Sequence, residues 1–168
     1  MRQWILLPII SGIIFVADQI TKAMVTQNLQ LGEAWAPFPQ FANWFDITHW
    51  SNTGAAFGMF PQLGGVFTVV AMFVSVGIVW YYRGLVGNDW LVRLSLGLQL
   101  GGALGNLIDR LRYGYVVDFI HFHFFPVFNI ADSAIVCGVA LLMWDLWQKE
   151  RQAQAHPPAT QTPDQNPN

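Results

Sequence analysis

Residues 64–82 read GGVFTVVAMFVSVGIVWYY, and none of these 19 side chains is charged. A helix needs about 20 mostly apolar residues to cross the hydrocarbon core of a bilayer, so this segment has the length and composition of a membrane span. Three more segments also lack charge, over shorter lengths: residues 4–17, 94–108 and 134–144. The sequence therefore predicts an all-α integral membrane protein with four transmembrane helices.

The overall composition agrees with a membrane protein. Of the 168 residues, 54% are hydrophobic and 11% are charged, whereas about 25% are charged in an ordinary soluble domain. The net charge of -2 provides no basic surface for nucleic acid. The eight tryptophans suit the aromatic belts of a membrane interface. The single cysteine, Cys137, excludes an internal disulfide and a cysteine cluster.

The positions of Lys and Arg predict the orientation in the membrane. Four spans place both termini on one side, and cytoplasmic segments carry the excess of Lys and Arg. One side holds Arg2, Arg83, Arg93, Lys149 and Arg151, and the other holds Lys22, Arg110 and Arg112. We therefore expect both termini to lie in the cytoplasm.

Two segments between the spans are rich in strand-forming residues. Residues 44–50 and 113–125 contain many β-branched and aromatic side chains, and both lie on the outer side. We expect them to form a small extracytoplasmic β-sheet at the outer interface.

The end of the chain differs from the rest. Residues 148–168 are polar and rich in proline, so we expect a disordered cytoplasmic tail after a membrane domain of residues 1–147. Within residues 94–108, Gly97, Gly101 and Gly105 form two overlapping GxxxG repeats. We interpret these as sites of close packing within the bundle rather than of dimerisation.

Polar side chains gather at the outer ends of the predicted spans and in the outer loops. Such residues are costly within a membrane and are therefore candidates for function. They are Asp18, Lys22, Asn52, Asn106, Asp109, Arg110, Asp118, Asn129 and Asp132. The structural alternatives are a surface ion pair for Asp18 and Lys22, a turn at Asn52, interface anchoring for Asp109 and Arg110, and a helix N-cap at Asn129 and Asp132.

Asp118 and Asp132 are the strongest candidates for catalysis, because Asp118 interrupts an apolar strand and two neighbouring carboxyl groups share one proton. The ionised member can take a proton from water while the protonated member polarises a carbonyl. Nearby amide and guanidinium groups would stabilise the charge that develops on the substrate oxygen. This pattern suits hydrolysis of an amide bond without a covalent intermediate.

A metal site is the alternative for the second strand. His121 and His123 share one face of an extended chain, whereas Asp118 points to the other face. With no third ligand in phase, we expect neither a metal nor a cofactor. Cys137 lies among apolar residues and is not expected to act as a nucleophile.

Five motifs in the sequence resemble those of lipoprotein signal peptidases, the signal peptidase II family. They are DQITK (18–22), NTGAAF (52–57), GGALGNLIDR (101–110), VVDF (116–119) and FNIADSAI (128–135). The resemblance covers residues 12–147, with the motifs in the family's order.

The resemblance implies a four-span aspartic endopeptidase of the bacterial plasma membrane, with its active site towards the outer face. Such an enzyme removes signal peptides from diacylglyceryl-modified prolipoproteins, cutting before the lipidated cysteine. Asp118 and Asp132 would be catalytic, and the site-shaping residues would be Asn52, Asn106, Arg110, Asn129, Asp18, Lys22 and Asp109. The partners would be prolipoproteins and membrane lipids, and we expect a monomer.

One segment departs from the family's pattern. Eight residues, 120–127, connect VVDF to FNIADSAI, and this connection is longer in many members. We therefore expect the loop over the substrate to differ in shape. We also expect Trp44, Trp50 and Phe60 to hold acyl chains at the interface.

Two other functional classes remain as alternatives. A proton-conducting transporter would carry polar residues through the depth of the membrane. A structural assembly subunit would explain the glycine repeats but not a clustered pair of carboxylates.

Overall fold

The computed structural model describes residues 5–54, 64–85 and 89–155. Within these ranges it contains four long helices: α1 (Leu6–Asn28), α2 (Gly64–Gly84), α3 (Trp90–Tyr113) and α4 (Ile130–Ala155). Each is long and apolar enough to cross a membrane. The predicted helical membrane protein with four spans is confirmed.

Three of the helices extend well beyond the charge-free segments that predicted them. Helix α1 continues to Asn28 and includes Asp18 and Lys22, while α4 already contains Asp132 in its first turn. Asp18 and Lys22 pair with each other inside the bundle, and Asp132 accepts a hydrogen bond from Asn106. A count of charge-free residues therefore underestimates the length of these helices. At its other end α4 continues to Ala155, past residue 147, where we placed the start of the tail. The rest of the expected tail lies outside the described residues.

Helix α3 forms the centre of the bundle and packs against the other three helices. Its glycines allow this close packing. A Cβ atom on Gly97 or Gly101 would lie 2.7 Å from atoms of Ile10 or Ser11 on α1. The prediction that the glycine repeats serve packing within the bundle is confirmed.

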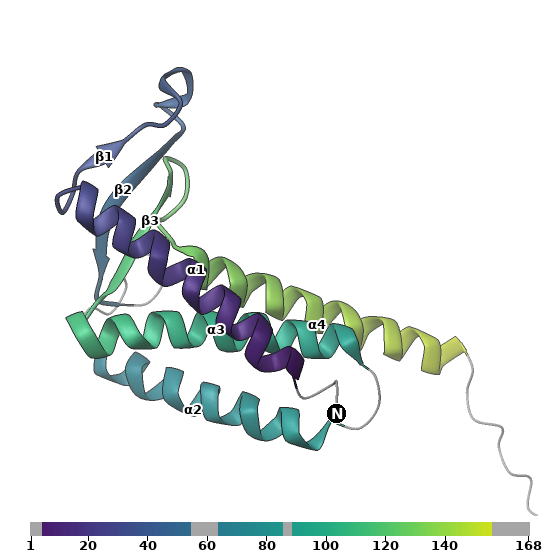
Figure 1. Cartoon of the computed structure of the whole chain (residues 1–168). Coiled ribbons are helices and arrows are strands. Elements are labelled where there is room, and N and C mark those ends of the chain that lie inside the picture. The colour runs from purple at the N-terminus through teal and green to yellow at the C-terminus, as the bar shows by residue number, and fades with distance from the viewer. Residues whose placement is uncertain (1–4, 55–63, 86–88, 156–168) are drawn as a thin grey trace, which may run out of the picture.

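A three-stranded antiparallel sheet lies at one end of the bundle (Figure 1). It consists of β1 (Ala34–Trp35), β2 (Phe45–Asn52) and β3 (Val116–Phe122), in that order, with a short 3-10 helix, η2 (Pro39–Phe41), before β2. Helices α1 and α3 end beside this sheet, and α4 begins beside it. The sheet residues therefore lie next to the polar ends of these helices. The predicted small sheet is present, and β2 carries an irregularity between Ile47 and Trp50.

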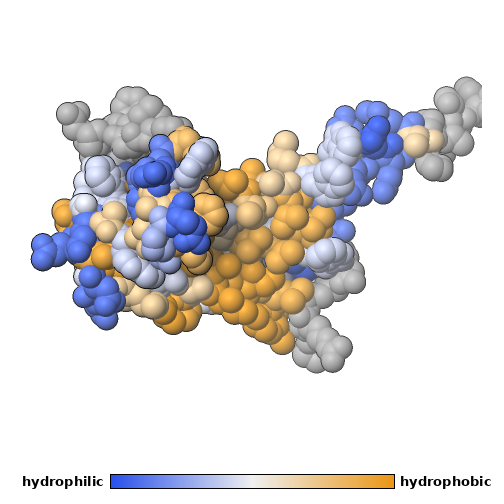
Figure 2. Space-filling model, turned by 90° about the horizontal axis from the view of Figure 1, so that it is seen from above, coloured by the Kyte–Doolittle hydropathy of each residue, from blue (hydrophilic) through white to orange (hydrophobic). Residues whose placement is uncertain are grey.

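The surface separates into an apolar middle and two polar ends (Figure 2). In this view hydrophobic residues cover the helices, and hydrophilic residues gather at the sheet and at the end of α4. Large apolar side chains such as Phe73 and Trp80 on α2 are exposed. This pattern matches a protein whose helices face lipid.

Candidate active site

Asp118 is buried at the junction between the sheet and the bundle. It lies on β3, with 1% of its surface exposed. The Asn52 amide donates a hydrogen bond to its Oδ2 at 2.9 Å, and the Asn129 amide donates to its Oδ1 at 2.6 Å. Both carboxylate oxygens are thus held by amide groups from other elements.

Asp132 lies on the first turn of α4, where the helix N-terminus attracts negative charge. The Asn106 amide donates to its Oδ1 at 2.7 Å, and the backbone N–H of Asn129 donates to its Oδ2 at 3.3 Å. Asn106 belongs to α3, so the second carboxyl group is also positioned by a neighbouring helix.

Asn129 joins the two aspartates. Its Oδ1 accepts the backbone N–H of Asp132 at 2.9 Å, as expected for the cap of a helix that starts at Ile130. Its Nδ2 donates to Asp118. The predicted N-cap is confirmed, and the same side chain also binds the partner carboxylate.

Asn52 has a similar double role. Its Oδ1 accepts the backbone N–H of Gly54 at 3.0 Å, which is the turn contact expected from its sequence. Its Nδ2 is then free to point at Asp118. The turn therefore fixes the orientation of an amide within the site.

A buried ionic cluster between α1 and α3 supports the positions of Asp118 and Asp132. Lys22 Nζ lies 2.8 Å from Asp18 and 2.7 Å from Asp109, and it donates to Asn106 Oδ1 at 3.0 Å. All four side chains are buried. The alternatives of a surface ion pair for Asp18 and Lys22, and of interface anchoring for Asp109, are wrong, because the lysine bridges two helices in the interior.

The two carboxylates of this cluster also bind the backbone of the elements that carry Asp118 and Asp132. Asp18 Oδ1 accepts the N–H of Ala131 at 3.0 Å, and Asp109 Oδ2 accepts the N–H of Val117 at 3.2 Å. Ala131 precedes Asp132 and Val117 precedes Asp118. The cluster therefore fixes the backbone immediately before each catalytic candidate.

Burial and neighbouring charge alter the acidity of Asp118. Removal from water raises its pKa to about 7, and the charge of Asp132 acts in the same direction. The amides of Asn52 and Asn129 oppose this shift because they stabilise the ionised form. Near neutral pH, Asp118 can therefore hold or release a proton.

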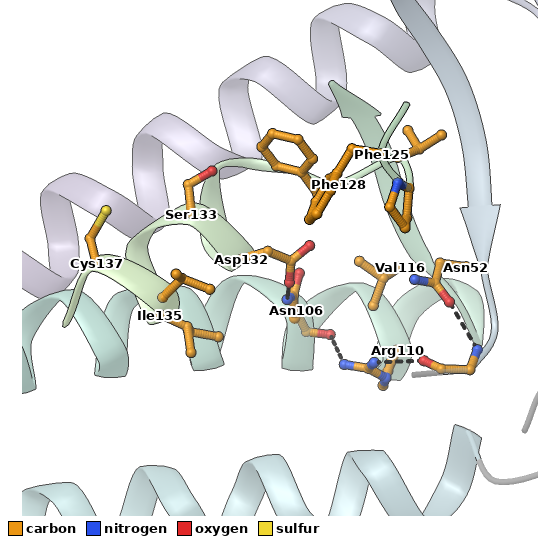
Figure 3. A pocket seen from close by; sticks show the side chains of 14 residues that line it. Asn52, Asn106, Arg110, Val116, Phe125, Phe128, Asp132, Ser133, Ile135 and Cys137 are labelled. Atoms are coloured by element: carbon orange, nitrogen blue, oxygen red, sulfur yellow. Dashed lines mark hydrogen bonds between the residues drawn. The ribbon is translucent and has the colours of Figure 1, made fainter. Parts of the chain in front are cut away.

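A cavity of about 480 Å³ opens beside Asp132 (Figure 3). Its polar lining comes from Asn52, Asn106, Arg110 and Asp132, and the apolar lining includes Phe125, Val127, Phe128, Ile135 and Val136. Asp132 and Asn52 line the cavity, and Asp118 accepts a hydrogen bond from Asn52. The site thus combines a polar corner with a larger apolar surface.

Arg110 lies at the edge of this cavity. Its guanidinium donates to the backbone carbonyls of Gly54 at 3.4 Å and Asn106 at 3.5 Å. Among the residues that the structure describes, its buried Nε has no hydrogen-bond partner. Arg110 therefore lines the cavity with a guanidinium group that two backbone carbonyls hold in place.

The structure brings all nine predicted site residues to this end of the bundle, and it adds several that the sequence did not reveal. Gln19 donates to both Asp18 and Asp109, which its position next to Asp18 in the sequence did not indicate. Cys137 lines the cavity. The apolar wall follows from the path of residues 125–128, which periodicity alone does not specify.

The statement that the histidines lack a third ligand is wrong. Asp46, on β2, faces both His121 and His123. The sequence considered only β3, whereas the third group comes from the neighbouring strand. Of the aromatic residues expected to hold acyl chains, Trp44 and Trp50 are exposed, and Phe60 lies outside the described residues.

The sequence matches the profile of a known family. Residues 10–148 match the family described as Signal peptidase (SPase) II. A lipoprotein signal peptidase of Moorella thermoacetica is 47% identical over 134 residues, which are 80% of this chain and 87% of that protein. One from Syntrophotalea carbinolica is 37% identical over 162 residues, covering 92% of this chain and 99% of that protein.

Solved structures show the same architecture. One bacterial membrane enzyme superposes with a TM-score of 0.79 at 27% identity, covering 92% of each chain. A second superposes with a TM-score of 0.73 at 30% identity, covering 82% of this chain and 90% of the other. The overall fold is therefore shared with known membrane enzymes.

Proposed function

The chain belongs to the signal peptidase II family, and we propose that it is an aspartic endopeptidase that uses Asp118 and Asp132 to remove signal peptides from diacylglyceryl-modified prolipoproteins. Cleavage falls just before the lipidated cysteine. The observation that carries this proposal is the contact of one side chain, Asn129, with both aspartates. Family membership also favours a protease over a transporter or an assembly subunit.

The two carboxyl groups divide the work of hydrolysis. A water molecule bound between them loses a proton to the ionised aspartate as its oxygen attacks the scissile carbonyl. Asp118, with its pKa raised to about 7, carries the shared proton and donates a hydrogen bond to that carbonyl. Asp132 faces the cavity and acts as the base.

The surrounding donors stabilise the charge that develops on the substrate oxygen. Asn52 and Asn129 hold Asp118, and Asn106 holds Asp132. The guanidinium group of Arg110, which lines the cavity, suits a carbonyl of the bound peptide. No step in this scheme requires a metal or a cofactor.

The cavity supports entry of the substrate from the lipid. Val136 lines the cavity and is also 67% exposed on α4, and Phe125 has the same double position. The apolar wall of the cavity therefore continues onto the lipid-facing surface. A substrate that carries acyl chains can move sideways into the site, with the active site towards the outer face and both termini in the cytoplasm.

Separate replacement of the two aspartates tests the mechanism. We expect Asp118→Asn and Asp132→Asn each to lower kcat by about 100- to 10,000-fold, the usual contribution of a general acid or base. Purified variants would be assayed for release of the signal peptide from a lipidated precursor. Asp89→Asn, at the opposite end of the bundle, is the matched control and should cleave normally. Normal turnover by either site variant, with an unchanged melting temperature, would refute the catalytic pair.

A further inference from the structure

Three metal-binding side chains meet on the outer sheet, away from the cavity. Asp46 lies on β2 directly opposite His121 on β3, and His123 follows two residues later on the same face of β3. One Asp46 oxygen lies 3.1 Å from His121 Nδ1, and the other lies 2.8 Å from His123 Nε2. The possible ligand atoms of all three residues lie within 4.8 Å of one another.

From this geometry we propose that Asp46, His121 and His123 form a binding site for one divalent transition-metal ion, with Zn²⁺ as the preferred occupant. Zinc binds imidazole nitrogens at about 2.0–2.1 Å and carboxylate oxygens at about 2.0–2.2 Å. Neighbouring ligand atoms of a tetrahedral site are then roughly 3.4 Å apart. The observed separations of 3.1 and 2.8 Å are shorter than this value and involve the two different Asp46 oxygens. Both rings must therefore move slightly away from the carboxylate to admit the ion.

The surroundings of the three residues favour a metal over an ordinary surface contact. The Asp46 side chain is only 12% exposed, and the two imidazole rings stack at a centroid distance of 4.7 Å. Both rings thus present a nitrogen to one largely buried carboxylate. Two nitrogen donors and one oxygen donor suit Zn²⁺, whereas Ca²⁺ and Mg²⁺ prefer sets of oxygen ligands.

The ion would retain an open coordination position. Three protein ligands leave the fourth tetrahedral position of zinc for water, and the His123 side chain is 42% exposed. Solvent therefore has access to the cluster. Asp118 contacts Asn52 and Asn129 rather than the histidines, so this site is separate from the catalytic pair.

The position of the cluster suggests what the metal does. The backbone N–H of His123 donates to Trp44 O at 3.1 Å, and the chain then continues to Phe125 and Phe128 in the cavity wall. A bound ion cross-links β2 to the start of this segment. The metal therefore stabilises the sheet and the wall against which the substrate packs.

Direct measurement of metal binding tests the proposal. Purified protein would be treated with EDTA, exchanged into chelator-free detergent buffer and titrated with Zn²⁺ by calorimetry. We expect one ion per chain and a higher melting temperature with zinc. Co²⁺ should give visible absorption bands typical of bound nitrogen and oxygen ligands.

Variants show whether the ion binds at this cluster. Asp46→Asn and His121→Ala should each weaken Zn²⁺ binding by at least about 100-fold, while His156→Ala, which removes an imidazole elsewhere in the chain, should leave it unchanged. Circular dichroism spectra equal to that of the wild type would show that the variants fold. Absence of saturable binding, or equal affinity in the cluster variants and the wild type, would overturn the proposal. The three side chains would then only form hydrogen bonds that join β2 to β3. Because the readout is binding, it is independent of the proposed protease activity.

Discussion

Asn106 connects the buried cation of the site to the aspartate that faces the cavity. Its Oδ1 accepts from Lys22, and its Nδ2 donates to Asp132. The positive charge of Lys22 therefore orients the amide, and the amide orients the carboxylate. Through this neutral amide, Lys22 influences Asp132 although the lysine itself does not lie beside the substrate.

Asp118 provides a prediction about pH. Because its pKa is raised to about 7, we expect kcat/KM to decrease above about pH 7, as the proton required on the pair is lost. At low pH both carboxyl groups are protonated, so the profile should be bell-shaped. Measurement of kcat/KM from pH 4 to 9 checks this.

The same shift has a consequence for stability. In the unfolded chain the carboxyl group ionises near its ordinary pKa of 3.8, whereas in the folded protein it stays protonated to about 7. Its contribution to the free energy of unfolding is therefore greatest below about pH 4 and decreases as the pH rises to about 7.

Replacement of Asn52 tests whether titration of Asp118 causes the decrease in kcat/KM on the alkaline side of the pH profile. Its amide stabilises ionised Asp118, so Asn52→Ala should move the alkaline limb to higher pH. Asn28→Ala, which removes an exposed amide at the end of α1, should leave it in place. If the limb stayed fixed in both variants, Asp118 would not be the group that titrates.

At the scale of the elements, the glycines of α3 set how closely the helices approach. A Cβ atom at Gly101 would lie 2.7 Å from both Ile14 Cβ and the backbone oxygen of Ser11. We expect Gly101→Ala to destabilise the protein by about 1–3 kcal/mol, as is usual for overpacking. Thermal unfolding in detergent would measure this.

Gly77 is the matched control, because among the described residues a Cβ atom there meets no atom of a neighbouring element within 4 Å. Gly77→Ala should be neutral or slightly stabilising, since alanine favours the helix. Equal stability of the two variants would indicate that α1 and α3 do not pack closely at Gly101.

The sequence was sufficient to predict the elements but not every contact between them. Hydropathy identified four spans, and residue composition identified the strands. The pairing of Asp46 with His121 depends on the register of β2 against β3, which follows from the folded arrangement and not from alternation along either strand. Likewise, the four-residue spacing of Asp18 and Lys22 predicts their pairing but cannot show that Asp109 joins them.

Motif resemblance predicted the nine site residues, because their chemical types are specified locally. The apolar cavity wall could not be predicted in this way. It forms where residues 125–128 fold back beside α4, a path that depends on the contact between Ile120 and Phe128. Side-chain chemistry could therefore be inferred from the sequence, whereas the shape of the site required the structure.

At the scale of the whole molecule, the two polar ends imply a definite orientation in the membrane. The end with the sheet carries Lys22, Arg110 and Arg112, and the other end carries Arg83, Arg93, Lys149 and Arg151. The excess of positive charge favours the cytoplasm for the second end. We therefore expect the proposed catalytic pair to face outward, where a secreted precursor would expose its cleavage site.

Labelling of single cysteines tests this orientation. Cys137 is the only cysteine in the sequence, so a Cys137→Ser background permits the introduction of one cysteine at a time. Leu31, beside the sheet, and Gln152, near the end of α4, are both exposed. In intact spheroplasts, a membrane-impermeant maleimide should label Leu31→Cys and should reach Gln152→Cys only after the membrane is permeabilised. The reverse pattern would place Asp118 and Asp132 on the cytoplasmic side and would contradict processing at the outer face.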